Sequence, residues 1–134
     1  MTSRLLSLLR ITSAFLYMAH GTQKLIGFPG GTAHVPYVSL HGLAGLIETT
    51  CGALILLGLF TRPAAIIASG EMAVAYVLVH FRQGFWPLLN HGELAVLYCF
   101  LFLYMAWAGP GPWSIDRARA DRGEVRSTGA RRLK

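Results

Sequence analysis

Two glutamates lie near the centres of long apolar segments, where a charged side chain is hardest to accommodate. Glu48 lies in the apolar run 41–60, and Glu71 lies in the run 63–81. A charge at the centre of a membrane-spanning helix costs roughly 3 kcal/mol on translocon scales, so such residues are paired or functional. We therefore expect the rest of the chain to supply partners for both carboxylates.

The first apolar run, residues 5–25, carries the cations that such carboxylates need. Arg10, Tyr17 and Lys24 follow one another at intervals of seven. At about 100° per residue, this spacing keeps all three on one side of a helix. The stripe predicts a polar seam that faces other helices. The alternative is that Arg10 and Lys24 extend towards opposite membrane interfaces.

Depth along antiparallel helices suggests two ion pairs. Counting about 1.5 Å per residue from the loop that joins the first two runs brings Lys24 level with Glu48. We predict that these two residues pair, with His20 as the proton partner of the carboxylate. The same counting predicts that Arg10 pairs with Glu71, deeper in the bundle.

Histidines, tyrosines and one further acid complete the candidate site. Glu93 stands at the start of the last apolar run, where the favourable interaction of a carboxylate with a helix N-terminus explains it equally well. The catalytic candidates are Glu48, His20 and Glu93, because histidine and carboxylate side chains transfer protons. A purely structural salt-bridge network is the alternative. The candidate binding residues are Arg10, Tyr17, His20, Lys24, His41, Glu48, Glu71, Tyr76, His80 and Glu93.

The composition indicates an integral membrane protein. Of the 134 residues, 54% are hydrophobic and only 13% are charged, and the mean hydropathy is +0.49. Soluble domains carry about 25% charged residues. We expect an all-α fold in which four transmembrane helices form an antiparallel up-down bundle within residues 1–116. The predicted spans are residues 5–25, 41–60, 63–81 and 92–108.

The positive charge is concentrated after the last span. Seven of the twelve Lys and Arg residues lie in the segment 117–134, which we expect to be a disordered basic cytoplasmic tail. Positive residues mark cytoplasmic segments, so both termini are predicted to lie on the cytoplasmic side of a bacterial inner membrane that the chain crosses several times. The bilayer, not a nucleic acid, is the expected partner of this charge. Cys51 and Cys99 form no CxxC motif, and no metal site is expected.

Several segments resemble the DoxX family of small four-helix membrane proteins. They are Arg10, HGTQKL at 20–25, GLIETTCGALILLGLFTR at 45–62, GEMAVAYVLVHF at 70–81, NHGELAVLYCFLFL at 90–103 and GPGPWSID at 109–116. His91 departs from the family, where a glycine is expected. The resemblance implies a four-helix membrane fold and a relation to membrane subunits of thiosulfate–quinone oxidoreductases and to oxidative-stress and sulfur-handling systems.

Three functions remain open from the sequence. The first is a redox membrane subunit that binds a quinone in the outer half of the bundle, where Tyr17, Tyr76 and the histidines line the ring. The chain has no flavin or metal motif and no covalently bound cofactor is expected, so a redox partner protein would carry the electrons and the chain would not be an enzyme by itself. The second is a small proton-coupled transporter. Small multidrug transporters carry a buried carboxylate in their first span, whereas the first span here carries Arg10 instead, which argues against this function. The third is a non-catalytic anchor or assembly factor, and a homo-oligomer is compatible with all three.

Overall fold

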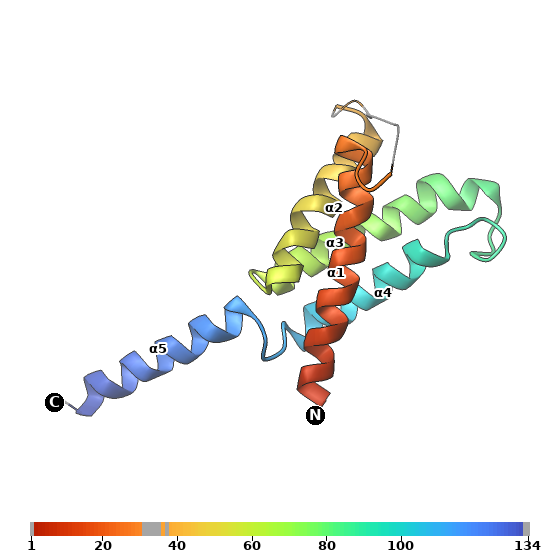
Figure 1. Cartoon of the computed structure of the whole chain (residues 1–134). Helices are drawn as coiled ribbons and strands as arrows, with labels where there is room; N and C mark the ends of the chain where they lie inside the picture. The colour runs from red at the N-terminus through yellow and green to blue at the C-terminus, as the bar shows by residue number, and fades with distance from the viewer. Residues whose placement is uncertain (1, 31–35, 37, 133–134) are drawn as a thin grey trace.

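The computed structural model describes residues 2–30, 36 and 38–132, and within these ranges every regular element is helical (Figure 1). Two of the helical segments, Leu40–Leu57 and Thr61–Gln83, are long and apolar enough to cross a membrane. The elements are α1 (Thr2–Ile26), α2 (Leu40–Leu57), α3 (Thr61–Ala75), the π-helical turn η1 (Tyr76–His80), the 3₁₀ turn η2 (Phe81–Gln83), α4 (Glu93–Ala108) and α5 (Ile115–Arg132).

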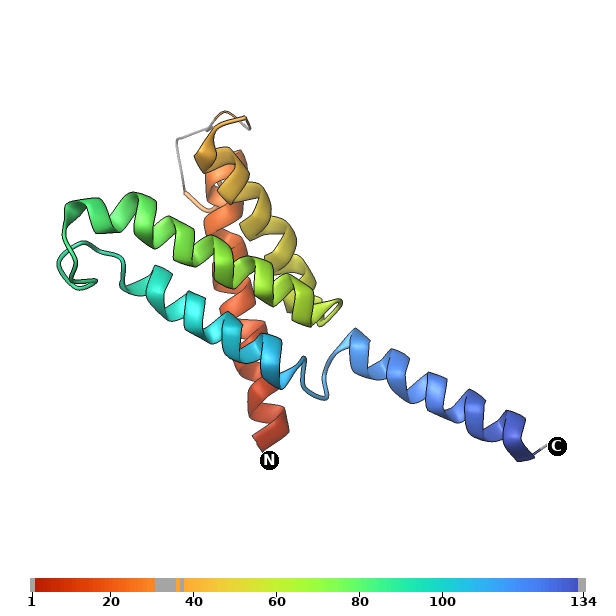
Figure 2. The same ribbon diagram turned by 180° about the vertical axis from the view of Figure 1, so that it is seen from behind.

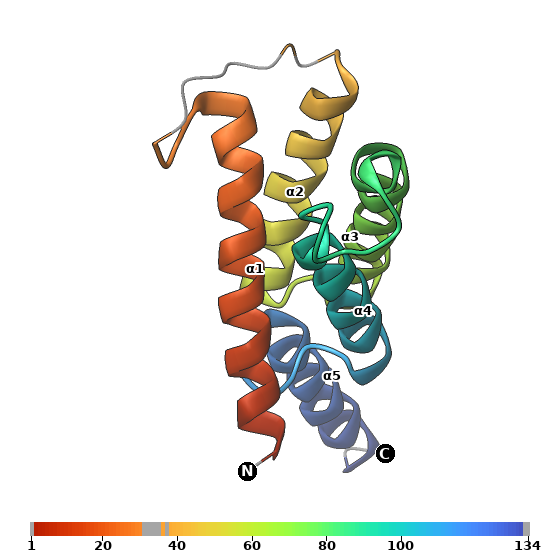
Figure 3. The ribbon, with the colours of Figure 1, turned by 90° about the vertical axis from the view of Figure 1, so that its right-hand side faces the viewer.

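The first four α-helices form two antiparallel pairs that cross each other. α1 packs along α2 and α3 packs along α4, while contacts between the pairs are fewer. Figures 1 and 2 show that the pairs approach each other at the end where α5 begins and separate towards the opposite end. The view in Figure 3 shows the close alignment of α1 with α2. The two helix pairs are therefore splayed apart at the end away from α5.

Glycines allow the close contact between α1 and α2. A Cβ atom on Gly21 would lie 2.5 Å from the backbone nitrogen of Thr49, and a Cβ on Gly52 would lie 2.7 Å from Cβ of Met18. Small residues at helix interfaces let backbones approach in this way. The buried face of α2 that carries Glu48 therefore consists largely of small residues.

The α3–α4 pair packs through alanines on one helix and larger side chains on the other. Ala65 and Ala68 of α3 are fully buried, as are Phe102 and Met105 of α4. The hydroxyl of Ser69 donates a hydrogen bond of 2.8 Å to the carbonyl of Cys99 across this interface.

The predicted ion pair between Arg10 and Glu71 is wrong. Arg10 is fully buried and donates to four backbone carbonyls: Pro110 (2.8 Å), Leu56 (2.6 Å), Ile55 and Trp113. These carbonyls come from the end of α2 and from the loop before α5, two places where backbone acceptors have no helical partner. The crossing of the helix pairs carries Glu71 away from this level.

Asp116 joins the same loop to the start of α3. Its carboxylate accepts hydrogen bonds from the backbone N–H groups of Phe60 (3.0 Å) and Thr61 (2.9 Å). Burial alone would raise the pKa of Asp116, but these N–H donors outweigh it and hold the pKa below its usual value. Gly58 takes the left-handed conformation at φ 67° that the tight turn between α2 and α3 requires. The motif at 109–116 thus holds the α2–α3 turn in place.

The expectation of a disordered tail is also wrong, because residues 115–132 form α5. The helix leaves the bundle and extends away from it (Figure 1). The hydroxyl of Ser114 caps it by accepting from the N–H of Arg117 at 3.2 Å, and Arg117 pairs with Asp121 at 3.1 Å. Local capping and an i,i+4 ion pair favour a helix even without an apolar face.

Candidate functional site

A cavity of about 520 Å³ lies between the two helix pairs, on the side where they separate. Its volume falls in the range of about 300–1,000 Å³ that is typical of small-molecule sites. Most of its wall is apolar and comes from α2, α3 and α4, and the polar side chains come mainly from α1 and α2. The apolar wall includes Leu43, Ile47, Ile67, Met72, Leu78 and Leu94.

The predicted pair of Lys24 and Glu48 is confirmed and lies in this cavity. The Lys24 ammonium donates to Oε1 of Glu48 at 2.7 Å. The side chain of Glu48 is 3% exposed and that of Lys24 is 30% exposed. The carboxylate is therefore the buried partner of the pair in the cavity wall, and the lysine is the more exposed one.

The second carboxylate oxygen of Glu48 is left without a partner. Among the buried side-chain atoms of the described residues, Oε2 of Glu48 has no hydrogen-bond donor. A buried unsatisfied acceptor costs about 1–3 kcal/mol, more when it is charged. Such an atom on the wall of a cavity is a place where a ligand could bind.

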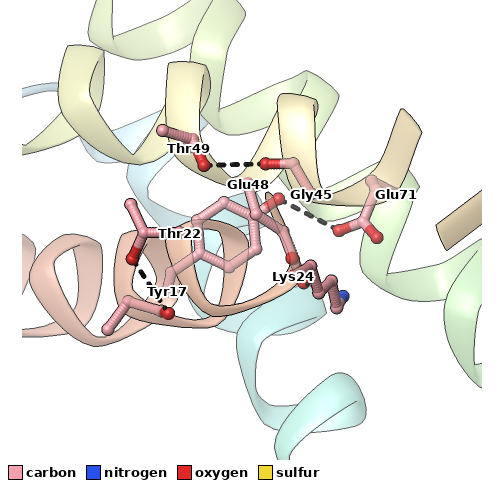
Figure 4. Close-up of polar contacts among 8 residues, drawn as sticks. Tyr17, Thr22, Lys24, Gly45, Glu48, Thr49 and Glu71 are labelled. Atoms are coloured by element: carbon pink, nitrogen blue, oxygen red, sulfur yellow. Dashed lines mark hydrogen bonds and ion pairs between the residues drawn. The ribbon is translucent and has the colours of Figure 1, made fainter. Parts of the chain in front are cut away.

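Glu71 pairs with a tyrosine instead of an arginine. The Tyr17 hydroxyl donates to Oε2 of Glu71 at 3.0 Å, linking α1 to α3 (Figure 4). Tyr17 is fully buried and packs edge-on against Phe102 at 4.8 Å between ring centroids. Glu71, Glu48 and Lys24 all line the cavity. Two carboxyl groups therefore share it with one ammonium.

Histidines surround the rim. His20, His41 and His91 are exposed and line the cavity, and His20 and His41 lie close enough to interact with the charge of Glu48. The described contacts include no hydrogen bond between His20 and Glu48, so the role of His20 as a proton partner stays a prediction. Within the described residues, no three His, Cys, Asp or Glu side chains form a group that could hold a metal ion.

The π-helical turn brings His80 to the same cavity as Glu71. In a regular α-helix their separation of nine residues would place them about 180° apart. The π-helical turn η1, Tyr76–His80, advances each residue by a smaller angle, and both side chains line the cavity. Nδ1 of His80 lies 3.0 Å from the carbonyl oxygen of Asn90, which is fully buried. The loop before α4 thus fixes the imidazole.

The cavity gathers most of the predicted site residues but not all of them. Those that line it are Tyr17, His20, Lys24, His41, Glu48, Glu71 and His80. Arg10 is engaged with backbone carbonyls, the Tyr76 hydroxyl donates to the carbonyl of Phe85, and Glu93 is exposed at the start of α4. None of these three lines the cavity.

Sequence reasoning missed Tyr98 and His91 as members of the site. Tyr98 is buried, stacks on Phe102 at 5.5 Å and faces His20 at 6.5 Å between ring centroids. A tyrosine inside the most apolar helix was a usable signal, because a buried phenol needs a specific environment. His91, at φ 55°, is not among the candidate binding residues predicted from the sequence.

One family model matches the chain, and several known proteins are similar to it. The family model described as DoxX matches residues 5–81. An uncharacterised protein of Haemophilus influenzae is 45% identical over 118 residues, which cover 83% of this chain and 87% of the relative.

Two further relatives are named as membrane proteins. An uncharacterised membrane protein of Mycobacterium tuberculosis is 29% identical over 137 residues, which cover 85% of this chain and 80% of the relative. Inner membrane protein YqjF of Escherichia coli is 32% identical over 114 residues, which cover 81% of this chain and 86% of the relative. No solved structure matches the chain.

Proposed function

The chain belongs to the DoxX family of membrane proteins, and from that premise we propose that it binds a quinone in the cavity between its helix pairs. In this role it is the membrane subunit of a redox system, and a partner protein supplies or removes the electrons. The observation that carries the proposal is an apolar cavity of about 520 Å³ with Glu48, Lys24 and Glu71 on its wall. A quinone is a lipid-soluble ring with polar oxygens. Its ring would pack on the apolar wall of this cavity, and its oxygens would lie near the polar side chains.

The polar groups divide into two proton-handling pairs. Lys24 and Glu48 form one at 2.7 Å, and Tyr17 and Glu71 form the other at 3.0 Å. The exposed imidazole of His20 lines the same cavity, and histidine exchanges protons near neutral pH. Protons taken up or released at a bound ring would pass along this route, whereas the electrons would pass to the partner.

We propose that four spans place this cavity in the outer half of the inner membrane. α1 to α4 would cross the bilayer, with both termini in the cytoplasm. Seven of the twelve Lys and Arg residues follow Asp116, which supports a cytoplasmic C-terminus. A relative named as an inner membrane protein supports the same membrane. A reporter that is active only in the cytoplasm, fused after Lys134, should give a signal, and a signal from an exported reporter instead would contradict this topology.

Quinone binding can be tested with two alanines of one helix. The protein is reconstituted in lipid nanodiscs and titrated with a short-chain quinone, with empty nanodiscs as the partition blank. Ala75 lines the cavity and Ala73 is exposed outside it. Ala75→Phe should weaken saturable binding at least tenfold, and the matched Ala73→Phe should leave it unchanged. Absence of saturable binding to the wild type, or equal behaviour of the two variants, would reject the proposal.

A second candidate is a non-catalytic anchor, which the projecting helix α5 favours (Figure 1). A charged helix outside the bundle offers a surface for a partner protein. The anchor would need α5 but not the cavity. Two results together would favour the anchor over the quinone proposal. Charge reversal at Arg119 and Arg122 would abolish binding of the partner protein, and Ala75→Phe would leave that binding unchanged.

A further inference from the structure

The two oxygens of the Glu48 carboxylate have different surroundings. Oε1 accepts from the ammonium of Lys24 at 2.7 Å, and Oε2 is buried without a donor in a residue that is 2% exposed. An ionised carboxylate is an acceptor on both oxygens. A ligand group that meets Oε2 must therefore donate a hydrogen bond.

No donor of the described residues reaches Oε2. The single hydroxyl proton of Tyr17 is donated to Glu71, and one N–H of the Lys24 ammonium is donated to Oε1. A quinone carbonyl can only accept a hydrogen bond. It would leave Oε2 of Glu48 without a donor and would place two acceptor oxygens beside each other. A phenolic hydroxyl would donate to Oε2 and could still accept a hydrogen bond from a remaining N–H of Lys24.

We propose that the cavity binds the reduced, hydroquinone form of its ligand in preference to the quinone, through a hydroxyl that donates to Oε2 of Glu48. This inference rests on the proposed function, and it adds which redox form the site is built for. The apolar wall contacts either form equally, because the rings have nearly the same shape. The discrimination therefore comes from the one hydrogen bond at Glu48, and hydrogen bonds to charged groups are the stronger ones.

Binding of the two redox forms to the wild-type protein is the first test. A short-chain quinone and its quinol, the latter kept reduced under anaerobic conditions, are titrated into the protein in nanodiscs. The quinol should bind at least tenfold more tightly. Such a preference raises the midpoint potential of the bound two-electron couple by about 30 mV for each factor of ten, which a redox titration measures independently.

Glu48→Gln is the sharper test because it should invert the preference. Lys24 needs an acceptor, so the amide oxygen takes the place of Oε1 and the amide N–H₂ takes the place of Oε2. The cavity would then present a donor, and the quinone should bind more tightly than the quinol. Asp121→Asn is the matched control, since Asp121 is an exposed carboxylate of α5 and lies outside the cavity. It should keep the wild-type preference.

The outcomes separate this inference from the proposed function. A wild-type protein that binds both forms equally, or the quinone more tightly, overturns the inference and leaves quinone binding in place. A wild-type protein that binds neither form removes the proposed function and the inference together. A folded Glu48→Gln variant that retains the quinol preference overturns the assignment to Glu48. If this variant does not fold, the comparison of the two forms on the wild-type protein decides alone.

Discussion

Arg10→Met removes the donors that tie α1 to the end of α2 and to the loop before α5. The carbonyl of Ile55 keeps a second donor, the N–H of Gly58 at 3.0 Å. The carbonyls of Leu56, Pro110 and Trp113 have Arg10 as their described donor. The N–H that would reach Leu56 in a longer helix, that of Phe60, is bound by Asp116.

The expected loss of stability follows from those three carbonyls. Each buried group left without a donor costs about 1–3 kcal/mol. Since all three are only partly buried, water can reach some of them, and we expect a total of about 3–5 kcal/mol. The stability of Arg10→Lys should lie between that of Arg10→Met and that of the wild type, because an ammonium offers its donors from one point and cannot span several carbonyls.

The assay is equilibrium unfolding in mixed micelles with increasing SDS, followed by circular dichroism. The matched control is Arg62→Met, because Arg62 is exposed and donates one hydrogen bond of 3.3 Å to the carbonyl of Ala106. That control should lose no more than about 1 kcal/mol. If Arg10→Met and Arg62→Met destabilise the protein equally, the carbonyls do not depend on Arg10 and the reasoning is wrong.

Three further substitutions test the close helix contact, the cap and the ion pair. Gly52→Ala should cost about 1–3 kcal/mol in the same assay, because the new Cβ would lie 2.7 Å from Cβ of Met18; Gly70→Ala, which meets open space, is its control, and equal stability of the two would contradict the proposed contact. Asp116→Asn should cost about 1 kcal/mol as a weakened cap. Because the pKa of Asp116 is depressed in the folded protein, the stability that it contributes is present above the ordinary carboxyl value of 3.8 and is lost as the pH falls through the folded pKa. The asparagine variant should lack this acid-dependent part of the unfolding curve. Lys24→Met should destabilise by about 2–3 kcal/mol, because the buried carboxylate loses its ammonium. The double variant with Glu48→Gln should recover much of that loss. A Lys24→Met variant as stable as the wild type would show that the ion pair contributes little to stability.

Helix positions and one ion pair could be predicted from the sequence alone. The apolar runs and their Gly- and Pro-rich ends locate α1 to α4 to within a few residues, because helix length and helix breakers are local properties. Lys24 and Glu48 could be matched because α1 and α2 are consecutive antiparallel neighbours. In such a pair, the distance of each residue from the connecting loop gives its depth.

The partners of Arg10 and Glu71 depended on the tertiary structure. Depth counting assumes parallel helix axes, and the crossing of the two pairs places Glu71 beside Tyr17 instead of Arg10. Crossing angles result from side-chain packing across an interface, which no local pattern encodes. The sequence showed that a buried Arg10 needed acceptors. Backbone carbonyls have no sequence signature, so only the tertiary structure decided that the end of α2 and the loop before α5 would provide those acceptors.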